Sequence, residues 1–382
     1  MRVTVACPGR FHVGDLAREL HRLGNEIEFH SMVPRSRLAS VGIPDEIQRC
    51  HLSRVWPWVI MQRFGKLGPS ASEMINRKII LSLDARYAKI RNPGDVFIGM
   101  SGLCVESLKA AKSRGALIVL ERGSKHILEQ KRILDDLRPT ANTPSLVPTW
   151  AVERELEGYE IADFIAIPAR HVKESFLLHG VPAHKLIRNA YGVDLDQFSP
   201  KLSVSKEFDV IMTGAWCQRK GCDTLAEAVL GKLKGKLLHI GPVGDCPLPK
   251  DRYFTHVDAV PQKELSRYYQ RARVFAMPSQ EDGFGMVFAQ ALACGLPVVG
   301  SVASGTPDLA ELLNLSHPWI QSVYPSDVDQ TAAAISIALA ASENPAPYLA
   351  AFAEKSEVLS WRSYGARYDE FLRSQIGRLD KI

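Results

Sequence analysis

The chain has 382 residues, of which 46% are hydrophobic and 23% are charged. At about 150 residues per domain, this length predicts two or three domains with substantial cores, and it excludes peptide hormones and disulfide-stapled scaffolds. The ordinary hydrophobic content also excludes an intrinsically disordered chain. The 7 cysteines are scattered and lack the paired spacing of a zinc site, so we expect reduced, mostly buried thiols and no metal.

The net charge of +5 comes from 47 Lys and Arg against 42 Asp and Glu. The excess lies in the first half, where residues 51–150 hold 16 basic and 8 acidic side chains. Residues 51–66 mix basic and aromatic side chains, among them Trp56, Arg63 and Phe64. This mixture favours an anionic acceptor or an anionic membrane surface as a partner rather than nucleic acid. A solvated basic face without a partner is the alternative.

Short aliphatic runs alternate with helical patterns through the first half of the chain. The runs that predict strands cover residues 2–6, 95–100, 116–121 and 163–167. A helical pattern follows each of them, which predicts βαβ units and a parallel sheet. We expect the first helix to begin near Gly14 and to end at Gly24. Within it, Leu16, Leu20 and Leu23 recur at helical spacing and are predicted to be core residues.

A polar stretch without an apolar period, residues 201–208, separates the two halves of the chain. Strand–helix alternation restarts after it, so we predict a first domain over 1–200 and a second over 207–360. An amphipathic helix with regularly spaced aromatic residues is predicted over 361–376. Ligands bind beyond the carboxyl ends of the strands in open α/β sheets, so two such domains facing each other would enclose a cleft. The strands predicted in the second half cover 209–214, 236–241, 253–260, 273–279 and 296–301, and the helices cover 221–231, 262–271, 285–294 and 326–341.

The densest chemical signal is PSQEDGFGMVFAQALACGLPVVGS, residues 278–301, where a strand end, a polar loop and a helix start follow one another. Gly283 and Gly285 let backbone N–H groups approach a ligand, and a helix N-terminus favours an anion such as phosphate. The acidic pair beside it, Glu281 and Asp282, suits the hydroxyls of a sugar attached to that phosphate. Gln290, two turns into the helix, could reach a ribose.

This segment resembles the signature of the retaining glycosyltransferases of family 4, also called group 1 glycosyltransferases, which have the GT-B fold. In that signature an acidic residue, a GFG sequence and a Glu eight residues further on bracket a nucleotide sugar. Asp282 and Gln290 occupy the two acidic positions. The glutamine retains a hydrogen-bond acceptor for ribose hydroxyls but lacks the charge of a carboxylate.

A second signal is TGAWCQRKGCDTLAEAV, residues 213–229, which follows the first strand of the second domain. Arg219 and Lys220 precede the helix that starts at Gly221, and cations at this place suit a diphosphate. The same family has a Gly-Arg pair here and then Lys-Gly. Lys220 and Gly221 match this pattern, whereas Ala215 replaces the arginine, so Arg219 is expected to compensate.

In the first domain, the segment CPGRFHVGDLAREL resembles the glycine-containing first loop of the family, which approaches the donor phosphate and the acceptor. Beyond the strand at 116–121, Glu121 and Arg122 are expected to project at its carboxyl end, unless they only pair with each other. The family often has a His after this strand that contacts the transferred sugar, a position assigned to His126. The stretch 189–200 and the helix from Trp361 also resemble the family, whose terminal helix crosses back to the first domain.

The resemblance implies a hexosyltransferase that moves a sugar from a nucleotide diphosphate donor to a glycan or lipid-linked acceptor with retained anomeric configuration. It implies no metal and no cofactor other than the donor, which acts as co-substrate. Cell-surface polysaccharide or glycolipid synthesis is the expected context. Catalytic roles are expected for Asp282, Glu281, Lys220, Arg219 and His126, donor contacts for Gly14, Gly283, Phe284, Gly285, Met286, Val287 and Gln290, and acceptor contacts for Arg10, His12, Glu121 and Arg122.

Three alternatives share parts of this pattern. A GT-B epimerase or a phosphorylase would have the same architecture, but no motif of either is found in the sequence. A non-catalytic, glycosyltransferase-like subunit that binds a nucleotide sugar or a partner enzyme would suit the departures at Gln290 and Ala215.

No apolar run approaches the roughly 20 residues of a membrane span, and the N-terminal run is too short for a signal peptide. We therefore expect a cytoplasmic protein, with attachment at the inner face of the membrane as a further option.

Overall fold

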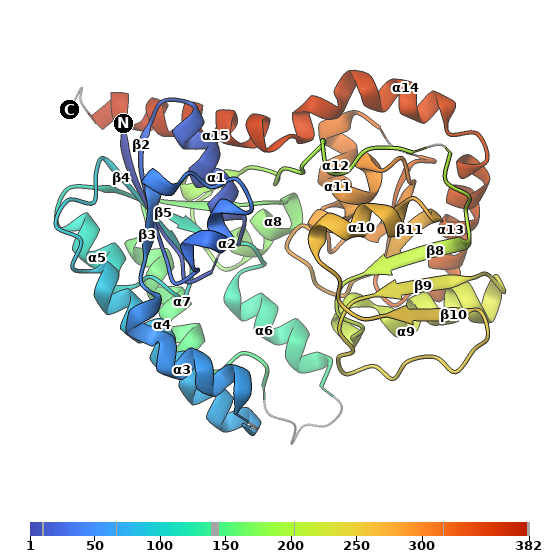
Figure 1. The fold of residues 1–382 in the computed structure, drawn as a ribbon, viewed down its shortest axis with the longest axis horizontal. Coiled ribbons are helices and arrows are strands. Elements are labelled where there is room, and N and C mark those ends of the chain that lie inside the picture. Colours follow the sequence, from blue (N-terminus) through green and yellow to red (C-terminus); the bar gives the residue numbers. More distant parts are fainter. Residues whose placement is uncertain (10, 66, 139–144, 202, 316, 380–382) are drawn as a thin grey trace.

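The structure is a computed structural model that describes residues 1–9, 11–65, 67–138, 145–201, 203–315 and 317–379. Two α/β domains lie side by side, and the last helices run along one side of both (Figure 1). Each domain is built on one parallel sheet, which confirms the predicted pair of parallel-sheet domains.

The sheet of the first domain has seven strands in the order β3-β2-β1-β4-β5-β6-β7. Helices cover both faces of this sheet, so β1 and β5 are almost entirely buried. Strand β5 is aliphatic up to its final Glu121, whereas β1 also contains Arg2 and Thr4. The strands are β1 (Arg2–Ala6), β2 (Glu26–Ser31), β3 (Gln48–Cys50), β4 (Val96–Met100), β5 (Leu117–Glu121), β6 (Phe164–Ile167) and β7 (Leu186–Arg188). The helices are α1 (Phe11–Arg22), α2 (Arg35–Ala39), α3 (Leu52–Phe64), α4 (Pro69–Tyr87), α5 (Glu106–Lys112), α6 (Ile127–Asp136), α7 (Thr149–Ile161) and α8 (Arg170–Leu178).

Helix α1 differs slightly from its prediction, because it begins at Phe11 rather than near Gly14. The predicted stop holds, since Gly24 follows the helix with a φ of 84°. Leu16 and Leu20 are fully buried, as predicted. Leu23 lies beyond the last helical residue and is half-buried, so it contributes less to the core.

The sheet of the second domain has six strands in the order β10-β9-β8-β11-β12-β13. The predicted helix over 221–231 is irregular, because a π-helical turn over Glu227–Lys232 follows α9. The strands are β8 (Phe208–Thr213), β9 (Leu237–Ile240), β10 (Phe254–Val257), β11 (Ala272–Met277), β12 (Val298–Ser301) and β13 (Ile320–Val323). The helices are α9 (Cys222–Ala226), α10 (Gln262–Tyr269), α11 (Met286–Ala293), α12 (Thr306–Leu313), α13 (Val328–Ser342), α14 (Ala346–Lys355) and α15 (Trp361–Leu379).

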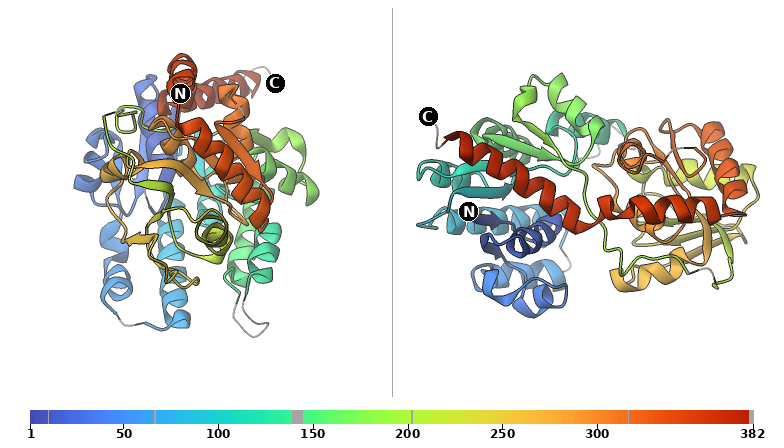
Figure 2. Two further views of the ribbon diagram at one scale, coloured as in Figure 1. Left: turned by 90° about the vertical axis from the view of Figure 1, so that its right-hand side faces the viewer. Right: turned by 90° about the horizontal axis from the view of Figure 1, so that it is seen from above.

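Helix α15 crosses from the second domain back onto the first, as Figure 2 shows. It approaches the chain closely at Gly192, where a Cβ atom would lie 2.7 Å from the backbone nitrogen of Trp361. Tyr364 and Tyr368 are buried against the first domain. The two domains also meet directly, because Arg188 of β7 forms an ion pair with Glu311 of α12 at 3.0 Å.

The described residues also bear on two further expectations. All seven cysteines carry free thiols, and five of them are buried. Among the described helices, none combines the length and the apolar character that crossing a bilayer requires.

Candidate functional site

Two loops of the second domain meet at the carboxyl edge of its sheet, because β8 and β11 are neighbouring parallel strands. Their backbones are joined where the N–H of Gln280 donates to the carbonyl of Arg219 at 2.9 Å. Gly221 allows this approach: its φ is 68°, and a Cβ atom there would lie 2.2 Å from the carbonyl oxygen of Pro278. A larger residue at 221 would therefore push the two loops apart.

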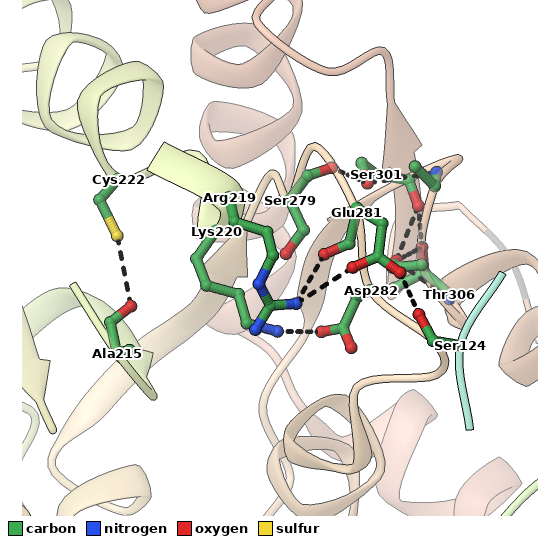
Figure 3. Close-up of polar contacts among 12 residues, drawn as sticks. Ser124, Ala215, Arg219, Lys220, Cys222, Ser279, Glu281, Asp282, Ser301 and Thr306 are labelled. Atoms are coloured by element: carbon green, nitrogen blue, oxygen red, sulfur yellow. Dashed lines mark hydrogen bonds and ion pairs between the residues drawn. The ribbon is translucent and has the colours of Figure 1, made fainter. Parts of the chain in front are cut away.

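Four predicted residues come together where these loops meet (Figure 3). Lys220 Nζ lies 2.5 Å from Asp282 Oδ2. Arg219 Nη1 lies 3.3 Å from Glu281 Oε2 and also donates to the backbone carbonyl of Glu281 at 3.0 Å. Glu281 is only 1% exposed, so its charge is largely removed from water and depends on these partners. Both cations are thus held next to carboxylates at one point of the sheet edge.

A hydroxyl network beneath this loop fixes its shape (Figure 3). Ser301 Oγ donates to the carbonyl of Ser279 at 2.6 Å, and Thr306 Oγ1 donates to the carbonyl of Ser301 at 3.1 Å. The N–H of Asp282 donates to the carbonyl of Ala303 at 3.1 Å. Because these groups are buried and paired, the acidic loop has one defined conformation.

Helix α11 begins directly after the acidic loop with Gly285, whose φ is 72°. A glycine at the N-cap brings no side chain to satisfy the first N–H groups, so those of Met286 and Val287 remain available to a ligand. The partial positive charge of a helix N-terminus favours an anion there. Phe284, the remaining residue of the GFG sequence, is instead buried and packs against Tyr191 with ring centroids 5.6 Å apart.

The acidic loop also touches the first domain. A Cβ atom on Gly283 would lie 1.6 Å from the carbonyl oxygen of Gly123, so the two domains are in backbone contact here. Ser124 Oγ donates a short hydrogen bond to the carboxylate of Glu281. No local pattern indicated Ser124, since its partner lies 157 residues away in the other domain.

His171, at the start of α8, is a second contact that sequence reasoning missed. Its Nε2 lies 2.7 Å from the carbonyl oxygen of Asp282, while its buried Nδ1 has no hydrogen-bond partner among the described residues. A carbonyl can only accept, so Nε2 carries the proton and donates it. Burial lowers the pKa of His171 to about 4, which keeps the ring neutral. The available signal was its position after β6, at the carboxyl edge of the first domain's sheet, where the segments after β1 and β5 also lie.

A cavity of about 860 Å³ lies between the domains. This volume is within the usual range for small-molecule sites. Of the predicted site residues, His12, Met286 and Gln290 line it. The other walls come from the rest of the first turns of α1, the chain around Gly192–Asp194 and the start of α10 at Pro261–Lys263.

Gln290 presents a hydrogen-bond donor, its amide nitrogen, to this cavity. Its Oε1 accepts a hydrogen bond from the hydroxyl of Tyr269 at 3.2 Å, and that hydroxyl lies 2.9 Å from Thr213 Oγ1. With the oxygen engaged inside the domain, the amide nitrogen is the group left for a ligand. A glutamate at this position would instead present a second acceptor oxygen.

The acceptor-side residues of the first domain mostly pair inside that domain. His12 Nε2 lies 2.8 Å from Glu121 Oε2, and the hydroxyl of Tyr368 donates to Glu121 Oε1 at 2.6 Å. Glu121 is therefore a buried link between α1, β5 and α15. Arg122 does not pair with Glu121: its Nη1 lies 2.7 Å from Glu155 Oε1, and both side chains are buried.

The remaining predicted residues lie away from the acidic loop or outside the described chain. His126 caps α6 by accepting from the N–H of Leu128 at 3.4 Å, and its ring stacks on His179 at 4.3 Å. Burial lowers the pKa of His126 to about 4. Gly14 is buried inside α1 rather than in the loop before it. Arg10 lies outside the described residues.

A metal site was not expected. In the part of the chain that the structure describes, no three His, Cys, Asp or Glu side chains gather in a way that could hold an ion.

The sequence of the second domain and the fold of the whole chain have counterparts in known proteins. Residues 207–341 match the model of a family described as "Glycosyl transferases group 1". The chain is 30% identical over 182 residues to the sulfoquinovosyl transferase of Arabidopsis thaliana, a match that covers 42% of this chain and 34% of the relative. It is 26% identical over 242 residues to a GDP-mannose-dependent phosphatidylinositol monomannoside mannosyltransferase of Mycolicibacterium smegmatis. This match covers 55% of this chain and 62% of the relative. The matches thus span less than two thirds of these relatives' lengths.

Two solved structures resemble the whole chain. Sucrose-phosphate synthase from Thermosynechococcus elongatus superposes with a TM-score of 0.68 at 16% identity, covering 99% of this chain and 100% of the other. Anabaena HepE in complex with UDP and glucose also superposes with a TM-score of 0.68, at 14% identity, covering 98% of this chain and 100% of the other. These similarities establish the two-domain GT-B fold for this chain.

Proposed function

We propose that this chain, whose second domain belongs to the group 1 glycosyl transferases, moves a hexosyl unit from a nucleotide diphosphate sugar to a glycan or lipid-linked acceptor. The observation that supports the proposal most directly is the convergence of Lys220, Arg219 and the uncapped N-terminus of α11 beside Asp282. This arrangement offers positive charge for a diphosphate and a carboxylate for the attached sugar.

In the proposed mechanism, the leaving diphosphate binds where Lys220 now meets Asp282. Lys220 then leaves Asp282 and pairs with the phosphate oxygens. These oxygens also accept hydrogen bonds from Arg219 and from the N–H groups of Met286 and Val287. Negative charge develops on the diphosphate as the glycosidic bond breaks, and fixed positive groups stabilise that charge. Asp282, released from Lys220, accepts hydrogen bonds from sugar hydroxyls. Glu281 stays paired and holds Arg219 in place.

We propose that the positive charge for this step comes from the protein and that transfer is metal-independent. Retention of the anomeric configuration rests on the resemblance of the segment 278–301 to retaining glycosyltransferases. The contacts at Gly283, Ser124 and His171 hold the domains together over the site, which excludes water and limits hydrolysis of the donor.

The cavity between the domains would receive the nucleoside and the acceptor. Gln290 would donate from its amide nitrogen to a ribose hydroxyl oxygen. On the opposite wall, His12 is the acceptor-side residue that reaches the cavity, and Glu121 positions its ring. Arg122 and His126 act through the packing of the first domain, because neither lines this cavity.

The similar proteins suggest the setting of the reaction. Their names include an amylovoran biosynthesis glycosyltransferase of Erwinia amylovora, at 24% identity, and the mannosyltransferase of Mycolicibacterium smegmatis, whose name contains a phosphatidylinositol lipid. We accordingly propose a role in cell-surface polysaccharide or glycolipid synthesis. We place the reaction in the cytoplasm, at the inner face of the membrane when the acceptor is lipid-linked.

The proposal is tested by incubating the purified protein with UDP-, GDP- and TDP-hexoses and following release of the nucleotide diphosphate, with and without a glycan acceptor. We expect turnover with one base family, and proton NMR of the product should give a retained configuration. Lys220→Ala and Asp282→Ala should each lower turnover by about 10²-fold or more while the protein remains folded.

Gln290 and Ala215 support a second candidate, a subunit that binds a nucleotide sugar without transferring it, because both depart from the family pattern. Nucleotide binding without any turnover would favour this candidate. Slow hydrolysis of a single donor, abolished in Lys220→Ala, would exclude it.

A further inference from the structure

Helices α3 and α4 form a hairpin that projects from the first domain on the side away from α15 (Figure 1). Within the described part of the chain, 16 large apolar side chains are exposed, and 6 of them belong to this hairpin. The six residues are Trp56, Ile60, Met61, Phe64, Met74 and Leu81. We call this set the hairpin face.

The hairpin face is not needed for the internal packing of the domain. Ile75, Ile79 and Leu83 already attach α4 to the core, since each is nearly fully buried. Val55 does the same for α3. Trp56, Ile60 and Phe64 follow one another at intervals of four residues, so they form a stripe along one side of α3. Single exposed apolar residues are ordinary, but a stripe of three large ones along one helix is typical of a binding surface.

The charges around the hairpin face are mainly positive. Residues 52–87 contain six basic and two acidic side chains. Arg54, Arg63, Arg77 and Lys78 are exposed. Of the two acids, Asp84 is buried and accepts from the first N–H groups of α5, so its charge does not face solvent. Glu73 is exposed, and it accepts a hydrogen bond from Trp150 Nε1 at 3.0 Å.

We propose that the hairpin face docks on an anionic membrane surface. Apolar and aromatic side chains flanked by arginine and lysine suit the boundary between lipid headgroups and acyl chains, where each basic group is attracted to anionic lipid. The charge of the hairpin is complementary to such a surface. Docking through this hairpin leaves the helices that join the domains on the opposite side of the molecule (Figure 1). The proposal goes beyond sugar transfer, because it requires neither donor nor acceptor.

The test is co-sedimentation of the full chain with vesicles of phosphatidylcholine, alone or mixed with phosphatidylglycerol. We expect binding to the mixed vesicles at low salt, weaker binding at high salt, and little binding to phosphatidylcholine alone. Phe64→Glu combined with Ile60→Glu should lower the partition coefficient by about tenfold or more, because it removes apolar contact and adds repulsion. Arg54→Gln combined with Arg63→Gln should weaken binding and flatten its salt dependence.

Leu178→Glu is the matched control, since Leu178 is 74% exposed and Phe64 is 75% exposed, but Leu178 lies on α8. It should bind vesicles like the unaltered chain. Thermal midpoints of all variants verify folding. The proposal is overturned if the unaltered chain stays in the supernatant with both vesicle types, or if the hairpin variants bind equally well. It is also overturned if size-exclusion chromatography shows a dimer that the hairpin variants abolish, because the face would then be a contact between two copies.

Discussion

The loops after β8 and β11 and the segments after β1 and β5 occupy comparable edges of the two sheets, yet they use their charged residues differently. In the second domain, Lys220 and Asp282 face each other at the surface where a ligand would bind, with side chains 12% and 14% exposed. In the first domain, Glu121 and Arg122 turn inward to separate buried partners. Charge at the end of a buried strand therefore does not by itself indicate a ligand site.

The difference has a physical cause in the neighbouring residues. Glycines at 221 and 283 let the loops of the second domain pack closely against neighbouring backbone, and Gly285 brings no side chain to the start of α11. The charged side chains therefore stay at the edge of the sheet. The first domain places His12 and the hydroxyl of Tyr368 directly over Glu121, which offers an internal partner for that carboxylate.

Replacing Arg122 by Met should destabilise the protein by about 3–5 kcal/mol, because the buried carboxylate of Glu155 loses its cation and keeps the hydroxyl of Ser101 as a donor. Urea unfolding measures this loss. Glu155→Leu added to Arg122→Met should restore much of the stability. If Arg122→Met instead abolishes nucleotide binding at unchanged stability, then Arg122 belongs to the ligand site and the contrast between the domains fails.

Replacing Lys220 by Ala should lower donor turnover by about 10²–10³-fold, the effect of removing one preorganised donor to a developing negative charge. The circular dichroism spectrum should not change. Lys232→Ala is the control, because it removes the ion pair with exposed Asp329 outside the site and should leave the rate unaltered. Equal activity of Lys220→Ala and the unaltered chain would contradict the proposed site.

Gly283→Ala should weaken the contact between the domains, since the added methyl group would lie 1.6 Å from the carbonyl oxygen of Gly123. We expect a cost of about 1–3 kcal/mol, typical of overpacking, together with reduced transfer. Gly68→Ala is a suitable control because open space surrounds that position. Small-angle scattering should show a more open molecule for Gly283→Ala, and an unchanged profile would argue against the contact.

The free energy of unfolding should fall as the pH drops from about 6.5 towards 4, and His171 should contribute to this fall. In this range His171 binds a proton in the unfolded chain but not in the folded protein, because folding lowers the pKa of His171 to about 4. Above pH 6.5 both states are neutral and the contribution is constant. His171→Gln keeps an N–H donor for Asp282 but does not titrate, so its stability should depend less steeply on pH. His126→Gln should also flatten the profile, but should leave activity intact.

Gln290→Glu should have the smallest effect, a change of less than about tenfold in nucleotide affinity, since one hydrogen-bonding group is exchanged for another. A carboxylate accepts from ribose hydroxyls, so we expect tighter binding of UDP relative to its 2′-deoxy analogue. Calorimetry with both nucleotides measures the ratio. An identical ratio in the two proteins would place the ribose away from residue 290.

Much of the fold could be predicted from the sequence, because the buried parallel strands β1 and β5 consist mostly of aliphatic residues. Strands β2 and β3 were missed, since β2 alternates acidic and apolar residues and β3 has three residues. Helices α3 and α4 were missed because apolar and basic residues occur on their exposed sides as well, which hides the helical period. The edge of the second sheet was predictable because its glycines and charges are close in sequence.

The partners of the first domain were not predictable, because they depend on tertiary contacts. Tyr368 reaches Glu121 across 247 residues, and His171 reaches Asp282 across 111. A local pattern carries no information on such pairs. The same holds for Ser124, whose contact with Glu281 exists only once both domains are folded and in contact.

The central claim is that Lys220 and the start of α11 hold a nucleotide diphosphate, and calorimetric titration of UDP and GDP tests it most directly. We expect one of the two nucleotides to bind the unaltered chain, Lys220→Ala to bind it at least about tenfold more weakly, and Lys232→Ala to bind it normally. Equal binding by Lys220→Ala, or no binding of either nucleotide by a folded sample, would contradict it.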